Sequence, residues 1–351
     1  MTSLALSPIG PFEAAGTRGR PTRVLVTGAG GPAAVAFMQA AVDTDIELWA
    51  ADTHRYAAGL YLVPAERRVL LPPGDSAEFA DRILILCRAL AINVFVPTLD
   101  DELLPIAAIR SRLEAAGVCV LAPATAALTS CLDLWLLVQL CVKHGIPVPR
   151  TRLLDRPMAL RSFDRPFAIR PRRRGGSGGA TVVGEHSVPP VVPLDGSQIL
   201  QEYLTGDEYS IDVLAYRDGH IAAVVPRSRR RTSSGIAVAG STVLDPELEE
   251  LGRRIAVALE LTAVASVQVR RDTAGTPKVI EVCPRFPSGM PLTIASGVNM
   301  PALALGDALG KPTSRRVPHR QVSMVRYWDQ HFVETSDLEQ QHIILADTTL
   351  R

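Results

Sequence analysis

The feature that most limits the fold of this chain is a change of pattern at residues 145–149, where the sequence reads GIPVP. Before this point, apolar β-rich runs such as Arg23–Thr27 alternate with helical segments such as Pro32–Val42. After it, strand-like runs dominate, and one helix is expected at Pro246–Leu259. Alternating strands and helices are typical of a parallel sheet covered on both faces, whereas successive strands favour antiparallel α+β domains. The sequence therefore predicts two architectures in series.

These patterns divide the chain into six parts. The first half is expected to contain a Rossmann-like domain, followed by a helix over residues 124–145 that ends at the proline-rich stop. The strand-rich half is expected to contain a small and a large subdomain. The predicted parts are a flexible N-terminal extension (1–21), the Rossmann-like domain (22–122), the linker helix (123–150), the small or lid subdomain (151–205), the large subdomain (206–335) and a C-terminal tail (336–351).

Composition excludes several classes of function. Hydrophobic residues make up 47% of the chain and charged residues 21%, as in soluble globular proteins rather than disordered ones. The net charge is +1, so no overall field favours nucleic acid or an anionic membrane as a partner. No apolar run approaches the roughly 18 residues of a membrane span, and residues 1–20 contain no signal-peptide core. The five cysteines form no CxxC pair, which favours reduced thiols and a cytoplasmic protein.

A glycine turn follows the first predicted strand. Residues 28–33 fit the pattern G-x-G-x-x-A, and Asp52 ends the next strand about 20 residues later. This is the fingerprint of dinucleotide sites, in which glycines admit a pyrophosphate and the acid binds the ribose. A tight strand-to-helix turn needs the same glycines without any ligand. An NAD(P)-binding oxidoreductase is therefore kept as an alternative.

The sequence PFAIRPRRRGGSGGATVV, residues 166–183, predicts two strands joined by a glycine-rich loop. Backbone N–H groups of such a loop can form an anion nest over a triphosphate, because glycine leaves the approach open. Arg170 and Arg172 alternate along the first strand, so their guanidinium groups share one face and could each bind a phosphate. The alternative is a basic surface hairpin that binds nucleic acid nonspecifically. The candidate phosphate-binding residues are Arg170, Arg172, Gly175, Gly176, Ser177, Gly178 and Gly179.

A second group of candidates lies in ILQEYLTGDEYS, residues 199–210. A strand that leads into an extended linker presents backbone groups to an adenine edge, and Glu202 can accept a hydrogen bond from the adenine amine. Glu208, beyond the turn at Gly206, could bind ribose hydroxyls. An ordinary strand–turn–strand unit explains the same residues without a ligand.

The last predicted strands carry the groups for metal binding and catalysis. Period-two alternation places Glu281 and Cys283 on one face of their strand and Val282 on the other. A carboxylate beside the neighbouring strand, which contains Gln268, suits the hard cation Mg²⁺. Arg285, just beyond, can stabilise a phosphoryl group during transfer. The alternative is a β-bulge that leaves a single exposed acid.

Taken in this order, the motifs resemble those of the ATP-grasp superfamily, most closely the branch similar to the carbamoyl-phosphate synthetase large subunit. The resemblance covers residues 22–330 and rests most specifically on QEYLTGDEYSIDV (201–213), VQV (267–269) and EVCPRFPSGMPL (281–292). It implies an ATP-grasp fold, with an N-terminal Rossmann-like domain and two antiparallel α+β subdomains that enclose ATP. It also implies a carboxylate–amine ligase that works through an acyl phosphate and converts ATP to ADP and phosphate.

The resemblance also implies cofactors, partners and roles for single residues. The cofactors are ATP and Mg²⁺, and the partners are a small-molecule carboxylate and an amine, with a homodimer as the expected assembly. Arg227 and the run 229–231 are candidates for contact with substrate or phosphate, although such a run more often forms a solvated charged face. The implied roles are phosphate binding by Arg170 and the loop 175–179, adenine binding by Glu202, Tyr203 and Leu204, ribose binding by Glu208, Mg²⁺ binding by Gln268 and Glu281 with Cys283 beside them, catalysis by Arg285 and Arg227, and lining of the carboxylate pocket by Ser288, Gly289 and Met290.

Three positions depart from the family pattern. Arg170 stands where the family usually has lysine, and Asp133-Leu134 stands where it has Asp-Lys, so one phosphate-binding cation is missing. Cys283 replaces the asparagine of a Glu-x-Asn metal pair, and a thiol is a soft ligand that suits Mg²⁺ poorly. The alternative function is therefore a catalytically weakened nucleotide sensor or scaffold. A covalent nucleophile at Cys283 is a minor alternative, because nearby cations would favour its thiolate.

Overall fold

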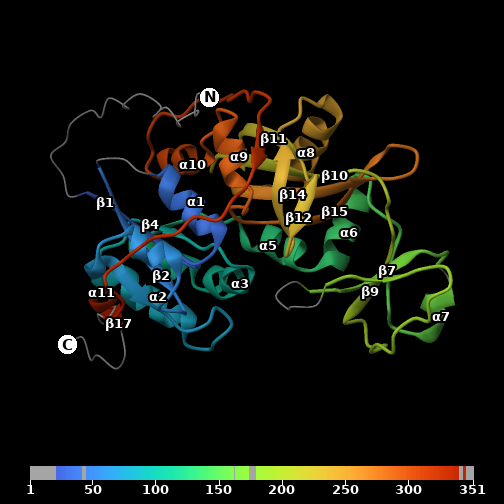
Figure 1. Cartoon of the computed structure of the whole chain (residues 1–351), viewed down its shortest axis with the longest axis horizontal. Helices are drawn as coiled ribbons and strands as arrows, with labels where there is room; N and C mark the ends of the chain where they lie inside the picture. The colour runs from blue at the N-terminus through green and yellow to red at the C-terminus, as the bar shows by residue number, and fades with distance from the viewer. Residues whose placement is uncertain (1–20, 42–44, 162, 174–178, 340–342, 345–351) are drawn as a thin grey trace.

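The computed structural model describes residues 21–41, 45–161, 163–173, 179–339 and 343–344. A six-stranded parallel sheet, in the order β17-β3-β2-β1-β4-β5, forms the first domain and confirms the predicted parallel architecture (Figure 1). No helix in these ranges is both long and apolar enough to cross a membrane. The elements of the domain are β1 (Thr22–Val26), α1 (Pro32–Ala40), β2 (Ile46–Asp52), β3 (Arg68–Leu70), α2 (Phe79–Ala89), β4 (Val94–Val96), α3 (Asp100–Ala108), α4 (Arg110–Ala115), β5 (Cys119–Val120) and β17 (Ile343–Ile344), with 3₁₀ turns at Ala58–Leu62 and Ala65–Arg67.

The central strand β1 is buried on both faces. Val24 and Val26 belong to the same hydrophobic cluster as Phe37 of α1, whereas Leu25 belongs to another cluster together with Ile83 of α2. Successive side chains of a strand point to opposite faces, so helices must cover both sides of this sheet. Because both faces of β1 are buried, its sequence is an uninterrupted apolar run, Val24–Val26, rather than an alternation of apolar and polar residues.

The linker consists of two helices rather than the one predicted over residues 124–145. Helix α5 (Thr125–Leu132) ends at Asp133, whose backbone is extended, and α6 (Leu134–Lys143) begins directly after it. The Asp133 carboxylate accepts hydrogen bonds from the backbone N–H groups of Trp135 and Leu136, at 3.0 and 3.1 Å. Aspartate is a strong N-cap, and this cap starts a new helix where apolar periodicity alone suggested continuity.

Two antiparallel sheets follow, as predicted from the change of pattern. The smaller has the order β6-β9-β7-β8, and the larger has the order β11-β10-β14-β15 (Figure 1). Residues of α5, α6 and α8 share one hydrophobic cluster with the larger sheet and so cover one of its faces. The bounds are β6 (Thr151–Leu153), α7 (Pro157–Arg161), β7 (Phe167–Pro171), β8 (Thr181–Val183), β9 (Gln198–Glu202), β10 (Glu208–Ala215), β11 (Ile221–Ser228), α8 (Pro246–Ala258), β14 (Ala263–Arg271) and β15 (Pro277–Cys283).

A third, three-stranded sheet was not predicted. It has the order β12-β13-β16 and consists of β12 (Arg231–Ser233), β13 (Ile236–Ser241) and β16 (Ser323–Val325). The two strands of the hairpin β12–β13 are short, and β12 is exposed throughout, so its sequence has no apolar alternation to reveal a strand.

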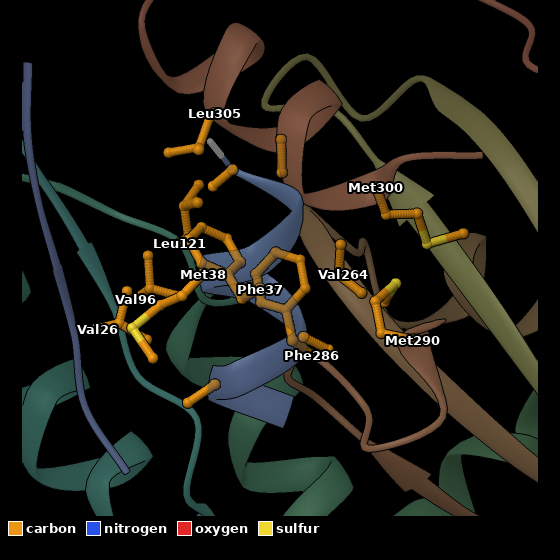
Figure 2. Packing of buried hydrophobic residues seen from close by; sticks show 14 of the residues in the cluster. Val26, Phe37, Met38, Val96, Leu121, Val264, Phe286, Met290, Met300 and Leu305 are labelled. Atoms are coloured by element: carbon orange, nitrogen blue, oxygen red, sulfur yellow. The ribbon is translucent and has the colours of Figure 1, made fainter. Parts of the chain in front are cut away.

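The first domain and the larger sheet share a hydrophobic core. Figure 2 shows Phe37 of α1 beside Phe286, with Met290 and Val264 close by. The rings of Phe37 and Phe286 pack edge to face, with their centroids 4.9 Å apart. Phe286 precedes α9 (Met290–Ala295), which is followed by α10 (Met300–Ala308). This packing fixes the loop 285–289 against the first domain.

The C-terminal segment returns to the first domain, although it was predicted to be a tail. After α11 (Thr335–Glu339), the short strand β17 pairs in parallel with β3. Asp337 binds the guanidinium of Arg68 through two hydrogen bonds of 2.9 and 3.1 Å, and this guanidinium also lies 4.6 Å from the ring centroid of Tyr61. The Arg68 side chain is 6% exposed. A buried guanidinium needs such a partner, and the carboxylate that supplies it comes from the C-terminal segment.

We expect Asp337→Ala to lower the free energy of unfolding by about 2 kcal/mol, because it leaves Arg68 buried without its carboxylate. The value is lower than for a fully buried pair, since the Asp337 side chain is 26% exposed. Urea unfolding at neutral pH measures the change. The control Asp81→Ala removes an exposed partner of Arg112 and should cost less than about 1 kcal/mol. Equal losses in the two variants would contradict a structural role for Asp337.

Candidate functional site

A cavity of about 340 Å³ lies over the end of the larger sheet. Glu281 and Cys283 of β15 both line it, whereas Val282 is fully buried in the core on the opposite side. The predicted alternation along this strand is therefore confirmed. The lining residues are Ser210, Arg227, Arg229, Ser234, Gly235, Ile236, Ala237, Ser266, Gln268, Glu281, Cys283, Arg285, Pro287, Ser288 and Gly289.

An ion pair joins the two antiparallel sheets beside this cavity. Arg170 of β7 donates to Glu281 of β15 at 2.6 Å and to Gln201 Oε1 at 3.0 Å. The Arg170 and Glu281 side chains are only 17% and 14% exposed, and Gln268 stands directly opposite Glu281 in the sheet register. The strand that leads into the glycine-rich loop thus faces the strand with the candidate metal carboxylate, and the short distance is typical of a charge-assisted hydrogen bond.

Arg172 is held by the residue that caps α6. Its Nε lies 2.9 Å from both carboxylate oxygens of Asp133. Leu134, which stands at the family's lysine position, is buried in the hydrophobic cluster of the larger sheet. A cation is therefore present beside Asp133, but it comes from the residue that follows β7 rather than from the helix. The predicted residues Gly175, Gly176, Ser177 and Gly178 lie outside the described residues, and Gly179 is exposed.

The predicted adenine and ribose residues lie around two cationic side chains that sequence reasoning missed. Glu202, at the end of β9, pairs with Lys278 at 3.1 Å. The carbonyl oxygen of Leu204 accepts a hydrogen bond of 3.1 Å from Arg270, whose other terminal nitrogen donates to Glu208 at 2.5 Å. Tyr203 lies between them in the sequence and is half-buried.

The sequence contained a signal for these two cations. Arg270 is two residues from Gln268 on β14, so the two share a face, and Lys278 is its partner in the register. Arg229 adds a second ion pair to Glu208, with its Nε 2.6 Å from Glu208 Oε1. The predicted solvated run 229–231 is therefore wrong for Arg229, whereas Arg231 is exposed.

Arg227 is fixed by a buried carboxylate. Its Nε and Nη2 donate to Asp212 at 2.8 and 2.6 Å, and the hydroxyls of Ser266 and Thr293 donate to the same carboxylate. A Cβ added at Gly289 would lie 2.0 Å from Arg227 Nη1, so glycine is required there. Asp212 was not predicted, because its position in an apolar strand gives no sign of its partners.

Arg285 and the turn after it contact the first domain. Arg285 Nε donates to Asp100, the first residue of α3, at 2.6 Å. Ser288 and Gly289 line the cavity, and their assignment to a carboxylate pocket stays a prediction. The prediction for Met290 is wrong, because its side chain is fully buried in the core cluster with Phe286 (Figure 2).

A further arginine comes from beyond the predicted motifs. Arg326, which follows β16, donates to the carbonyl oxygen of Ser288 at 2.7 Å. Burial, and secondarily the charge of Arg227, lower the pKa of Arg326 below its ordinary value. Two guanidinium groups therefore meet at the turn that borders the cavity. No motif marks Arg326, since only the pairing of β16 with β13 brings it there.

The candidate metal ligands fit a cation that brings ligands of its own. Glu281 supplies one carboxylate and Gln268 one amide, while the thiol of Cys283 is a poor ligand for Mg²⁺. In the described part of the chain, no three histidine, cysteine, aspartate or glutamate side chains gather to hold a metal. Mg²⁺ commonly needs one or two carboxylates together with substrate phosphates. The residues present fit Mg²⁺ that arrives with a nucleotide.

In the glycine turn of the first domain, groups expected to bind a dinucleotide form hydrogen bonds within the chain instead. Asp52 accepts hydrogen bonds from the backbone of Gly30 and of His54, at 2.7 and 3.0 Å. Gly59 donates to the carbonyl of Ala29 at 3.0 Å, and a Cβ at Gly59 would lie 2.2 Å from that oxygen. The carboxylate expected to bind ribose in a dinucleotide site is thus used within the turn, which favours the purely structural alternative.

A buried carboxyl group lies at the carboxyl ends of β1 and β4. One oxygen of Glu102 accepts hydrogen bonds from the Thr27 hydroxyl and from the backbone of Thr98 and Leu99, at 2.7, 3.1 and 3.2 Å. Burial nevertheless raises the pKa of Glu102 to about 7, because the charged form loses its hydration.

Comparisons with known proteins identify a similar family model and several solved structures of similar fold. Residues 196–331 match the model of a family described as ATP-grasp in the biosynthetic pathway with Ter operon. A comparison with curated proteins finds no match to this sequence. Similar solved structures include a biotin carboxylase complex from Campylobacter jejuni, with 13% identity and a TM-score of 0.67 over 85% of this chain and 73% of that one.

Two further structures share this fold. N5-carboxyaminoimidazole ribonucleotide synthetase from Thermotoga maritima has 17% identity and a TM-score of 0.64 over 84% of this chain and 78% of that one. L-amino acid ligase from Bacillus licheniformis has 18% identity and a TM-score of 0.65 over 84% and 76%. Identities this low establish a common fold and leave the substrate open.

We expect Glu102→Gln to change how stability depends on pH. Folding raises the pKa of Glu102, so between pH 5 and 8 the unfolded chain binds fewer protons than the folded one, and stability falls as pH rises. Glutamine cannot ionise, so the variant should gain about 2 kcal/mol relative to the wild type over this range. Urea unfolding at several pH values measures it. The exposed control Glu78→Gln should show a constant difference, and a constant difference for Glu102→Gln would contradict the raised pKa.

Proposed function

We propose, from the premise that this chain has the ATP-grasp fold, that it is an ATP-dependent ligase that joins a carboxylate to an amine through an acyl phosphate. The observation that carries the proposal is the ion pair of Arg170 with Glu281. It brings a phosphate-binding candidate and a metal-binding candidate together from two sheets, next to a cavity. The proteins of similar fold include an L-amino acid ligase, which supports this class of reaction.

ATP would lie between the two antiparallel sheets. Arg170 lies in β7 and Arg172 directly after it, and each is oriented by a carboxylate, so their guanidinium groups are held in place before phosphates arrive. Glu202, the Leu204 backbone and Glu208 lie further along, where the base and ribose would bind. Phosphates would compete with the internal carboxylates for the arginines, because both are anionic acceptors.

The reaction balances in two steps. A carboxylate oxygen of the substrate attacks the γ-phosphorus of ATP, the bond to the β-phosphate oxygen breaks, and ADP leaves. The amine nitrogen then attacks the acyl carbon, the bond to the phosphoryl oxygen breaks, phosphate leaves, and the nitrogen loses a proton. Arg227 and Arg285 face the cavity and would stabilise the negative charge that develops in both steps.

Magnesium, when bound with ATP, would neutralise charge on the phosphate oxygens. Glu281 and Gln268 are the residues that would hold it. Arg170 neutralises the buried carboxylate of Glu281, with which it forms a hydrogen bond. Positioning and charge neutralisation therefore supply the catalysis, without a protein nucleophile.

One observation favours a second function, a nucleotide sensor with weak turnover. Cys283 places sulfur in the cavity at the position of the expected asparagine, 4.0 Å from the amide nitrogen of Gln268. Leu134 removes a second expected polar group from the site. Such a protein would bind ATP through the same arginines and turn it over slowly.

We expect Arg170→Ala to weaken ATP binding by about ten- to a hundredfold, the usual value of one or two hydrogen bonds to a charged group. Calorimetry with MgATP measures the dissociation constant. Arg315→Ala is the matched control, because Arg315 pairs with Asp218 on the surface. The absence of any nucleotide affinity in the wild-type protein would refute the proposed function.

ADP release should depend on both a carboxylate and an amine, and Cys283→Asn should raise it by about tenfold, because an amide oxygen is a better neighbour for Mg²⁺ than sulfur. A coupled assay for ADP, with Mg²⁺ varied, measures this. If Cys283→Asn leaves the rate and its Mg²⁺ dependence unchanged, the metal site is not weakened. Unchanged activity in Cys283→Ser would exclude the covalent alternative.

A further inference from the structure

The hairpin β12–β13 forms one wall of the cavity. Its tip is the turn Ser234–Gly235, in which both residues have positive φ, 47° and 77°. Turns of this kind join two strands tightly, with glycine favoured where φ is positive. The tip residues and the next two, Ile236 and Ala237, all line the cavity. Four consecutive residues of the hairpin therefore contribute to the cavity wall.

The hairpin is fixed at its base. Strand β13 pairs with β16, and the hydroxyls of Ser241 and Ser323 lie 2.8 Å apart. A Cβ at Gly240 would lie 2.1 Å from the carbonyl oxygen of Ser228, so β13 crosses β11 in direct backbone contact. Ser241 N also donates to Ser228 Oγ at 3.0 Å. The base cannot move away from the larger sheet without breaking these contacts.

The hairpin is also fixed at its tip. Arg229 Nη2 donates to the carbonyl oxygen of Gly235 at 2.8 Å. The same guanidinium pairs with Glu208 through Nε, and its side chain is only 11% exposed. A wall held at both ends has a defined distance from the opposite side, so it can select substrates by size.

The walls combine small size with polarity. Among the lining residues are four serines, two glycines and an alanine, and none is aromatic. The volume of about 340 Å³ is near the lower end of the roughly 300–1,000 Å³ usual for small-molecule sites, and the transferring phosphoryl group must share it. The hydroxyls of Ser210 and Ser266 are already bonded to Arg229 and Asp212. Those of Ser234 and Ser288, which also line the cavity, would offer hydrogen bonds to a polar substrate.

We infer that the acid substrate of this site is a small polar carboxylate, such as a short amino or hydroxy acid, and that Ile236 and Ala237 of the hairpin set its upper size. This inference rests on the proposed ligase function. Large aromatic acids are excluded by the hairpin wall, while the serine hydroxyls favour acids that carry a polar group. Selection by size can be measured, because one methylene more or less in an apolar pocket changes kcat/KM by about tenfold or more.

The test uses the full chain with MgATP and hydroxylamine, a small nucleophile that converts acyl phosphates to hydroxamates. Glycine, serine and aspartate are compared with leucine, phenylalanine and tryptophan, and both ADP and hydroxamate are measured. We expect kcat/KM for the best small polar acid to exceed that for phenylalanine by at least about tenfold.

Two variants locate the selection in the hairpin. Ile236→Gly should raise kcat/KM for leucine or phenylalanine by about tenfold or more, and Ala237→Leu should lower it for serine more than for glycine. Thr232→Ala is the control, since Thr232 lies on β12 outside the cavity lining and is exposed. Unchanged MgATP affinity shows that each variant is folded.

The outcomes distinguish a failure of the substrate-size inference from a failure of the proposed ligase function. Preference of the wild-type protein for aromatic acids, or an unchanged preference in both hairpin variants, overturns the inference and leaves the ligase function intact. Hydroxamate from no acid at all, with MgATP still bound, overturns the ligase function and the inference together. Small-acid preference that relaxes in Ile236→Gly and stays in Thr232→Ala supports both.

Discussion

The constraint on which the site depends is the pairing of its arginines with carboxylates from other elements. Arg170 meets Glu281, Arg172 meets Asp133, and Arg285 meets Asp100. Charges removed from water are costly unless they are paired. These contacts therefore hold the two antiparallel sheets, the linker helices and the first domain against one another before any ligand binds. When a nucleotide binds, its phosphates would replace the carboxylates as partners of these arginines. The arginines are therefore already in place, and no charged group has to be moved into an apolar site.

Much of the fold follows from local patterns. The parallel sheet was predictable because its strands are apolar runs between helices. The end of β15 was predictable because Val282 alternates with Glu281 and Cys283, although a register shift interrupts the pairing with β14 between Gln268 and Val269. The hairpin β12–β13 was not, since its exposed arginine, serine and glycine residues become strands only through pairing with β16. The break at Asp133 was hidden for a related reason, because an N-cap inside an apolar stretch changes no periodicity.

The site was predictable where a motif carries its own chemistry. Glu281, Arg170 and Ser288 lie beside or along the cavity as their neighbours in sequence suggested. Asp100 and Arg326 were missed because their roles arise from distant contacts, 185 residues along the chain in the case of Asp100 with Arg285. Met290 was misplaced because the resemblance assigned it together with its neighbours, whereas it is the first residue of α9 and its side chain is buried in the core.

The contact of Arg68 with Asp337 has a consequence for how this chain is made. The two residues are 269 positions apart, so β3 gains its neighbour β17 only after both antiparallel sheets have been synthesised. Until then the edge of the first sheet is open, and open edges invite pairing with other chains. Closing so long a loop is slow compared with local folding. Closure of this sheet edge therefore depends on a segment that is synthesised after both antiparallel sheets.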